Sequence, residues 1–560
     1  MQTIKKLLIK SFFGLSCLFS GIVLAETFDD IDDIMGCITH IAAPTPPLQG
    51  NGCVNAIDIL QIITPEFGQS GCSPTQGTCP PANCIINAPA ILQENFYIST
   101  VGPITRRSLL DEPSLRNYVL DDCMLHLTIQ PFYNYTPRVV FNKNSPFIRS
   151  YLDFANSTIL NQIDLALEIS GCATVDIPNI LSLFSGLKLQ QHRAGIMFGI
   201  GSKIGSLNLS FRIPLYYIVE HFFLTDAEIE AIGNAPFLAN NPGFSSDLTS
   251  KEKGEEFGLK HLVSDRVGFG DMRMNAMFNI YEDCRDHFWF GIQMTIPTAR
   301  TFKAGLLGAS FNPCTNPPPF NIKQLFELFL CATNDIEQRG ANAKIQEITT
   351  AFFIGALDRL STILFNAPLG NGRHFGVGPQ IDFVHELNEN WSVQTYAAFE
   401  GFSKHNEDRF FLAKKTPQEF NRNWRDEANA EANLSFLNQQ VINTFFPTRV
   451  KTAIRIGYLG KYATSLVCES LNWHGFVGFD YWYNSAEKIY TNDQSLAEFD
   501  IEKGAREAAH QGKFFFSFGY RNLYHCDKIF FDAEFAGDIG MFSRGIGNSY
   551  TLGFRLSLDI

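Results

Sequence analysis

Hydrophobic and polar side chains alternate along the last twelve residues of the chain. Tyr550, Leu552, Phe554, Leu556, Leu558 and Ile560 fall on one face, and Ser549, Thr551, Gly553, Arg555, Ser557 and Asp559 fall on the other. A period of two is the spacing of a β-strand whose faces meet different surroundings. The same alternation recurs within 287–298 and 512–523, where phenylalanines share one face. The pattern predicts strands with one apolar and one wet face.

The whole chain contains twelve segments of this kind, most of them near the ~9–11 residues that a tilted membrane strand needs. They are 122–135, 190–200, 205–218, 270–281, 287–298, 374–386, 391–402, 450–459, 470–483, 512–523, 528–538 and 549–560. Long connections (136–189, 219–269, 299–373, 403–449 and 484–511) alternate with short ones (201–204, 282–286, 387–390, 460–469 and 524–527). Long outer loops and short periplasmic turns are typical of outer-membrane barrels. We therefore expect an all-β fold, a transmembrane antiparallel up-and-down β-barrel of about twelve strands over residues 122–560.

Composition agrees with this expectation. After Ala25 no run of eighteen apolar residues occurs, which argues against a helical membrane protein. Aromatic residues make up 13% of the chain and the mean hydropathy is −0.03, as expected for strands that alternate between lipid and water. A soluble globular protein of this length is the alternative.

The N-terminus has the form of a cleavable signal peptide. Lys5, Lys6 and Lys10 precede the apolar run 12–24, which ends in the small-residue motif at Ala25. A lipoprotein attached through Cys17 is the alternative. Removal of residues 1–25 deletes three lysines and no acid, so the formal charge falls from −13 to −16. So acidic a mature chain argues against nucleic acid as a partner.

Residues 26–121 have a different composition, with cysteines among prolines and glycines and few alternating runs. Five cysteines lie there: Cys37, Cys53, Cys72, Cys79 and Cys84. We expect a small domain that either lies in the periplasm or plugs the barrel. The segment 51–58 faintly resembles a calcium-binding loop, but its early acidic ligands are missing, so we predict no metal and no cofactor.

Short helices are expected in the outer loops. In the loop 299–373, apolar residues recur at spacings of three and four, which gives one apolar helix face: Ile345, Ile348, Phe352, Ala356, Leu360 and Ile363. This helix either constricts the barrel mouth or packs on neighbouring loops outside the pore. Thr225 with Glu228 forms a capping box that predicts a second helix, 226–232.

The less apolar face of each strand is expected to line the pore. Its predicted lining residues are Arg193, Arg212, Arg273, Asp271, Asp382, Glu400, Arg455, Asp480, Arg521, Asp532, Glu534 and Arg555, with Lys451 and Lys513 on the same faces. Arg193, Arg212 and Arg273 fall in three consecutive strands, and a basic row there would favour anions. The alternative is that these side chains pair with nearby carboxylates and fill a narrow barrel.

Four more cysteines are expected at the periplasmic end. Cys284, Cys468 and Cys526 fall in three different short turns and Cys123 begins the first strand, whereas Cys172, Cys314 and Cys331 belong to outer loops. Disulfides are permitted in the periplasm, so these thiols could tie the N-terminal domain to the rim or link neighbouring molecules as a homo-oligomer. The alternative is that they are small buried residues without bonds.

Two short segments carry a resemblance to known families. Gly268-Phe269-Gly270-Asp271 and the hairpin up to Thr298 resemble the Gly-x-Gly-Asp hairpin of outer-membrane channels associated with phenol degradation. The last strand resembles the barrel-assembly signal through Thr551, Gly553, Leu556 and Leu558, which implies the barrel-assembly machinery and outer-membrane lipid as partners. In abundance of cysteine the chain is similar to the chlamydial major porins.

Together these patterns predict an outer-membrane channel for passive passage of small solutes, with a weak anion preference. A surface-exposed structural or adhesin barrel with a blocked lumen is the alternative. A hydrolase is a third class, but a lipid hydrolase would need serine and histidine together near the lipid face, and the predicted outward faces offer no such pair. We therefore do not expect an enzyme.

Overall fold

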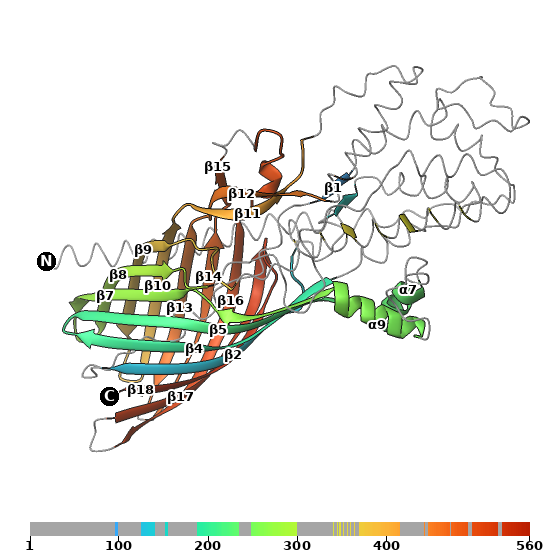
Figure 1. Ribbon diagram of the computed structural model, residues 1–560. Helices are drawn as coiled ribbons and strands as arrows, with labels where there is room; N and C mark the ends of the chain where they lie inside the picture. Colours follow the sequence, from blue (N-terminus) through green and yellow to red (C-terminus); the bar gives the residue numbers. More distant parts are fainter. Residues whose placement is uncertain are drawn as a thin grey trace, which may run out of the picture. The chain divides into compact units, whose positions relative to one another are not determined.

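Within the described residues the computed structural model is dominated by one closed antiparallel barrel (Figure 1). The residues described are 96–98, 125–140, 152–154, 188–234, 248–299, 369–414, 446–470, 472–490, 496–524 and 529–559, with single positions between 340 and 363 and at 442. The barrel strands are β2 (His126–Thr136), β4 (Lys188–Ile204), β5 (Leu207–Phe223), β6 (Val263–Phe269), β7 (Met272–Glu282), β8 (Asp286–Ile296), β9 (Gly376–Glu386), β10 (Trp391–Phe402), β13 (Leu459–Glu469), β14 (Trp473–Asn484), β16 (Ala509–Tyr524), β17 (Ile529–Arg544) and β18 (Tyr550–Asp559).

Twelve strand positions close the barrel. Each strand pairs antiparallel with its neighbours, and β2 joins β18, the last strand, to β4. β6 and β7 pair with successive stretches of β5, so they occupy one position that is interrupted at Gly270 and Asp271. The predicted all-β, twelve-strand antiparallel barrel is confirmed.

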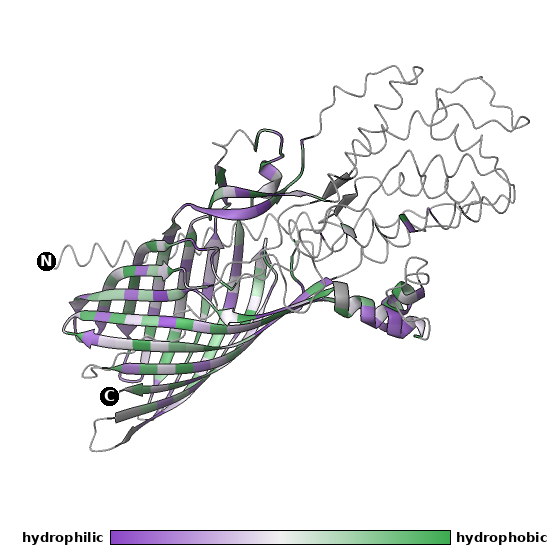
Figure 2. Cartoon of the chain, in the orientation of Figure 1, coloured by the Kyte–Doolittle hydropathy of each residue, from purple (hydrophilic) through white to green (hydrophobic). Residues whose placement is uncertain are grey.

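The alternation in the sequence corresponds to the two faces of the wall (Figure 2). In β18, Leu552, Phe554 and Leu556 are exposed, whereas Thr551 and Arg555 are buried. β8 and β16 behave in the same way. In a closed barrel the exposed apolar residues form the outer surface and the buried polar residues point inward. Hydropathy therefore assigned the faces of these strands correctly.

Short turns join the strands at one end of the barrel, which we call the turn end. They are 205–206, 283–285, 387–390 and 470–472, and the ends of β16 and β17 on the same side are separated by four residues of the chain. At the other end, the loop end, the connections are longer, except for 545–549 between β17 and β18. The helices α7 (Asp226–Asn234) and α9 (Ser250–His261) lie between β5 and β6, and the predicted capping box of Thr225 with Glu228 begins α7.

The predicted strand 450–459 is wrong as a barrel strand. Residues Thr448–Arg455 form β12, which pairs with β11 (His405–Phe411) and β15 (Lys488–Tyr490) in a separate three-stranded sheet. The barrel strand is β13, within a stretch predicted as a turn. β13 escaped detection because its inward face carries apolar Ala463 and Val467, so its two faces hardly differ in hydropathy.

Several expectations fall outside the described residues. These are the signal peptide, nearly all of the predicted domain 26–121, and every cysteine except Cys284 and Cys468. The exception in that region is β1 (Phe96–Ile98), which pairs with β3 (Leu152–Phe154). Among the described helices, none is long and apolar enough to cross a membrane.

Candidate functional site

The barrel interior is the candidate site, and most of the predicted pore-lining residues lie there. Those that are buried on inward faces or beside the mouth are Arg193, Arg273, Asp271, Glu400, Asp480, Asp532, Glu534 and Arg555, while Arg212, Asp382 and Arg521 are half-buried. Arg455 is misplaced in the prediction, because it belongs to β12 outside the barrel sheet and its guanidinium lies 5.3 Å from the ring centre of Tyr458. Lys451 shares that strand.

The three arginines of the expected basic row are not in one place. Arg212 lies opposite Arg273 in the β5–β7 register, whereas Arg193 lies opposite Ile218. Arg212 is also opposite Gly199, six residues along β4 from Arg193, which is about 20 Å at the usual strand rise. The interior therefore has a pair of arginines and a separate one.

These arginines have interior partners. Arg273 lies 3.8 Å from Glu400, whose carboxylate also accepts a 2.9 Å hydrogen bond from Gln293. The guanidinium of Arg193 lies 5.6 Å from the ring centre of Tyr216 and donates to Gln191. The Glu400 carboxylate offsets the charge of Arg273 and so weakens the positive field in this part of the interior.

Asp271 anchors a loop. Its carboxylate accepts hydrogen bonds from the backbone N–H groups of Ala299 (3.1 Å) and Asn371, which lie near the two ends of the loop 297–375. Thr298 completes the junction by donating to the carbonyl of Gly270 at 2.7 Å. A Cβ at Gly270 would overlap the rings of Tyr216 and Pro214, so glycine permits this close approach. The Gly-x-Gly-Asp hairpin is therefore the anchor of the longest loop.

An apolar cluster lies beside this anchor. Phe132, Met197, Tyr216 and Ile218 point inward from β2, β4 and β5, and Ala299 and Leu369 from the loop ends pack against them. We call these six residues the mouth cluster. Phe132, Tyr216 and Ile218 lie in the half of the barrel nearer the loop end, and Met197 lies near mid-height. Apolar side chains therefore line this part of the interior.

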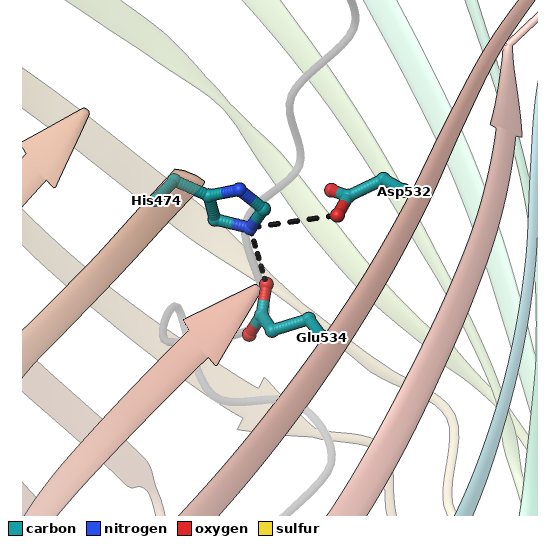
Figure 3. Close-up of side chains that lie close together, drawn as sticks. All are labelled: His474, Asp532 and Glu534. Carbon is teal, nitrogen blue, oxygen red and sulfur yellow. Dashed lines mark ion pairs between the residues drawn. The ribbon is translucent and has the colours of Figure 1, made fainter. Parts of the chain in front are cut away.

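A charged cluster occupies the interior near the turn end (Figure 3). His474 Nε2 lies 3.4 Å from a Glu534 oxygen and 3.5 Å from an Asp532 oxygen. Arg555 pairs with Glu534 and lies 3.8 Å from Asp532, and Arg521 lies 3.8 Å from the same Asp532 oxygen as Arg555. We call these five residues the lumen cluster. Each carboxylate is shared between a histidine and at least one arginine.

Register explains why the lumen cluster forms. Gly519 of β16 lies opposite both His474 of β14 and Glu534 of β17, so these two side chains belong to strands two apart. Gly519 has no side chain between them, and a Cβ there would overlap the imidazole ring. The missing side chain lets His474 reach the carboxylates across the intervening strand.

A second buried charge network joins the loops. Both ring nitrogens of His374 face acceptor oxygens, with the Ser403 carbonyl at 2.6 Å from Nδ1 and a Glu407 carboxylate oxygen at 2.8 Å from Nε2. Arg409 binds Glu407 and Glu487, both at 2.9 Å, and Arg506 lies 3.8 Å from Glu487. We call these five charged residues, His374, Glu407, Arg409, Glu487 and Arg506, the loop network. It connects residues from three separate loops.

Burial and pairing shift the pKa values in the loop network. Burial disfavours the charge on Glu407, but the hydrogen bond from His374 and the nearby Arg409 and Arg506 lower its pKa to about 2. Burial likewise disfavours the charge on His374, yet its bonds to Glu407 and Ser403 leave its pKa raised. His374 is therefore held as an imidazolium that donates at both nitrogens.

The two described cysteines are free thiols. Cys284 lies exposed in the short turn 283–285, as expected, and Cys468 is the last residue but one of β13 rather than a turn residue. Cys468 is still close to the turn end, because the turn 470–472 follows. The predicted disulfides stay predictions, since their other cysteines lie outside the part of the chain that the structure describes.

The predicted helix of the loop 299–373 is described only at single positions. Ile348, Ala356 and Ile363 are helical, and Ala356 and Ile363 are buried. The guanidinium of Arg359 lies 5.6 Å from the ring centre of Phe410 in β11. This contact favours packing on a neighbouring loop sheet over a position inside the barrel.

Comparison with known proteins gives no family. No family model matches the chain, and no curated protein matches it. Among solved structures, an outer membrane channel from Pseudomonas putida F1 is 9% identical, with a TM-score of 0.37 over 78% of this chain and 96% of that chain. The P. putida toluene transporter TodX is 7% identical, with a TM-score of 0.29 over 84% and 96%, and a Pseudomonas aeruginosa FadL homologue is 9% identical, with a TM-score of 0.26 over 83% and 98%. These comparisons give no support to the expected similarity to chlamydial porins.

Proposed function

We propose that the chain is a bacterial outer-membrane channel for small solutes. The observation that carries the proposal is the closed barrel with an apolar outer face and a polar interior. Exposed Trp391 and Trp473 begin strands beside the short turns, while exposed Tyr483 and Tyr550 lie at the loop end. Aromatic residues at both edges of an apolar band are typical of barrels that span the outer membrane.

The two ends of the interior suggest which solutes pass. The mouth cluster offers apolar and aromatic contacts at the loop end, and the lumen cluster offers paired charges at the turn end. We therefore propose small solutes with an apolar face as the preferred class. The weak anion preference expected from Arg193, Arg212 and Arg273 is the weaker part of the proposal, because Arg273 is next to Glu400.

Solute uptake into proteoliposomes tests this proposal. We expect the purified chain to admit small aromatic alcohols faster than sugars of similar size. Tyr216→Ala, which removes a ring from the mouth cluster, should change the ratio of the two rates, since that ring faces the path. Tyr217→Ala is the matched control, because Tyr217 is the next residue and is exposed on the outer face. Equal effects of the two substitutions, or no uptake above protein-free vesicles, would contradict the proposal.

A blocked structural barrel is the second candidate, and one observation favours it. Lys513 and Glu534 have no exposed surface inside the barrel, and Lys513 pairs with Asp538 at 2.7 Å. Interior charges so fully covered by their neighbours leave little room for a solute. Reversal potentials under a salt gradient separate the candidates and also test selectivity. Anion preference that weakens in Arg193→Glu or Arg212→Glu would place these side chains in the conduction path, and the absence of any current would favour the blocked barrel.

A further inference from the structure

We propose that His474, Asp532 and Glu534 form a binding site for a divalent transition-metal ion, Zn²⁺ in the first place. The atoms that they offer, one imidazole nitrogen and two carboxylate oxygens, all lie within 4.8 Å of one another, and all three residues are buried. Nitrogen and oxygen ligands of this kind suit Zn²⁺, which binds them at about 2.0–2.2 Å. Ligand atoms grouped this closely need only small side-chain rotations to reach one ion.

His474 supplies an independent observation that favours a ligand. Its side chain is 4% exposed, and its Nε2 atom points between the two carboxylates (Figure 3). Within the described residues neither Nε2 nor the facing Asp532 Oδ1 atom has a hydrogen-bond partner. Buried polar atoms are ordinarily satisfied, so two unsatisfied atoms that face each other across a shared gap call for a bound group. A cation would satisfy the nitrogen lone pair and both carboxylates together.

The surroundings of the site would both orient its ligands and compete with the ion. Arg521 and Arg555 hold the second oxygen of Asp532, which leaves the oxygen facing His474 for a metal. Arg555 also pairs with the Glu534 oxygen that faces His474, so this oxygen must serve both partners or exchange one for the other. Groups that hold metal ligands in place raise affinity, whereas a nearby positive charge lowers it. The site is therefore expected to bind a metal with an affinity limited by Arg555.

The position of the site is set by the backbone. His474 and Glu534 lie on strands β14 and β17, in register with Gly519 of β16, which separates the two strands. Bound metal would therefore tie together strands that do not pair directly. This inference does not depend on whether the barrel conducts solutes.

Metal titration of the purified, EDTA-stripped chain in detergent tests the proposal. Co²⁺ is the spectroscopic probe, and Zn²⁺ is the competitor. We expect saturable binding of a single Co²⁺ ion with visible d–d absorption, reversed by Zn²⁺. His474→Gln and Asp532→Asn should each weaken binding by more than the roughly 10–100-fold typical of losing a supporting group, because each removes a direct ligand. His287→Gln is the matched control, because His287 also lies within 4.0 Å of two carboxylates, Glu282 (3.7 Å) and Glu386 (3.5 Å), but it is only half-buried and both carboxylates are exposed.

Two further variants make the test specific to this geometry. Arg555→Gln should tighten Co²⁺ binding by about tenfold, because it removes a positive charge beside the ligands. Gly519→Ala should weaken binding, because its Cβ displaces the imidazole. Heat-modifiable migration in electrophoresis confirms that each variant is a folded barrel. Absence of saturable binding by the unaltered chain, or equal loss in His287→Gln and His474→Gln, would overturn the proposal.

Discussion

His374 and His474 lie in two buried charge clusters that resemble each other in composition and differ in geometry. Each histidine has glutamate and arginine nearby. In the loop network both ring nitrogens of His374 have partners at 2.6 and 2.8 Å, which are ordinary hydrogen-bond lengths. In the lumen cluster the one facing nitrogen of His474 lies 3.4 and 3.5 Å from two carboxylates. Both ring nitrogens of His374 are therefore bonded, whereas the facing nitrogen of His474 has no hydrogen-bond partner among the described residues.

This difference in geometry implies a difference in role. Hydrogen bonds and ion pairs of ordinary length fix His374, Glu407 and Arg409, and the loop network ties three loops together. A cluster with longer distances and unsatisfied atoms gains from binding something else. We therefore assign a structural role to the loop network and a binding role to the lumen cluster. Substitutions at matched positions in the two clusters test this assignment.

The largest effect is expected from Arg409→Met. This substitution leaves Glu407 and Glu487 buried without their shared cation, which costs roughly 3–5 kcal/mol in the free energy of unfolding. Arg521→Met in the lumen cluster should cost less than about 1 kcal/mol, because Arg521 is partly exposed and 3.8 Å from its carboxylate. Urea unfolding of the refolded chain in lipid vesicles measures both values. If the two substitutions lowered the free energy of unfolding by similar amounts, the loop network and the lumen cluster would not differ in role as proposed.

A smaller difference is expected between the two histidines themselves. His374→Gln loses two hydrogen bonds at a fully buried position, for which we expect about 1–3 kcal/mol. His474→Gln in metal-free protein should cost less, because no ordinary hydrogen bond is broken. The same unfolding experiment in the presence of EDTA compares them. A larger cost at His474 would show that its contacts already stabilise the metal-free barrel.

The pH dependence of the loop network is expected to be the mildest effect. The pKa of Glu407 is lowered from 4.5 to about 2, so its stabilisation is complete above pH 4.5 and is lost as the pH falls towards 2. The pKa of His374 is raised above 6.5, so its stabilisation is complete below pH 6.5 and is lost as the pH rises through the raised value. The loops should therefore resist proteases best between pH 4.5 and 6.5.

Limited proteolysis across this pH range, with rates corrected for the activity of the protease, checks the window. Glu407→Gln should flatten the profile on both sides, because it removes the acid and leaves His374 facing a neutral amide instead of a carboxylate. A profile that is the same in the variant and in the unaltered chain would show that these loops are held by other contacts.

Hydropathy located eleven of the twelve barrel positions because lipid and interior impose opposite requirements on neighbouring residues. It failed at β13, where Ala463 and Val467 make the interior face apolar, and it missed β6, which precedes Gly270. The turn end of the interior was foreseeable in part, since Asp532, Glu534 and Arg555 stand on polar faces. The contacts of His474 with Asp532 and Glu534 could not be foreseen, because they depend on the register of β14, β16 and β17.

The loop network was not foreseen from the sequence. Its residues come from segments far apart in the chain, and loops have no periodicity that would indicate which side chains meet. Arg409 and Arg506 look like ordinary surface charges in the sequence. Only the sheet β11–β12–β15 and the segment after β15 bring them to Glu487. The anchoring role of Asp271 was likewise hidden, since a polar residue at the end of a strand is equally consistent with a pore lining.

Single-channel recording from the purified chain in a planar lipid bilayer tests the central claim most directly. If the barrel is a channel, discrete conductance steps should appear on insertion, and Tyr216→Ala at the mouth should change their size while Tyr217→Ala on the outer face leaves it unaltered. A chain that migrates as a folded, heat-modifiable barrel and inserts into the bilayer without any conductance would contradict the claim and identify the barrel as a structural one.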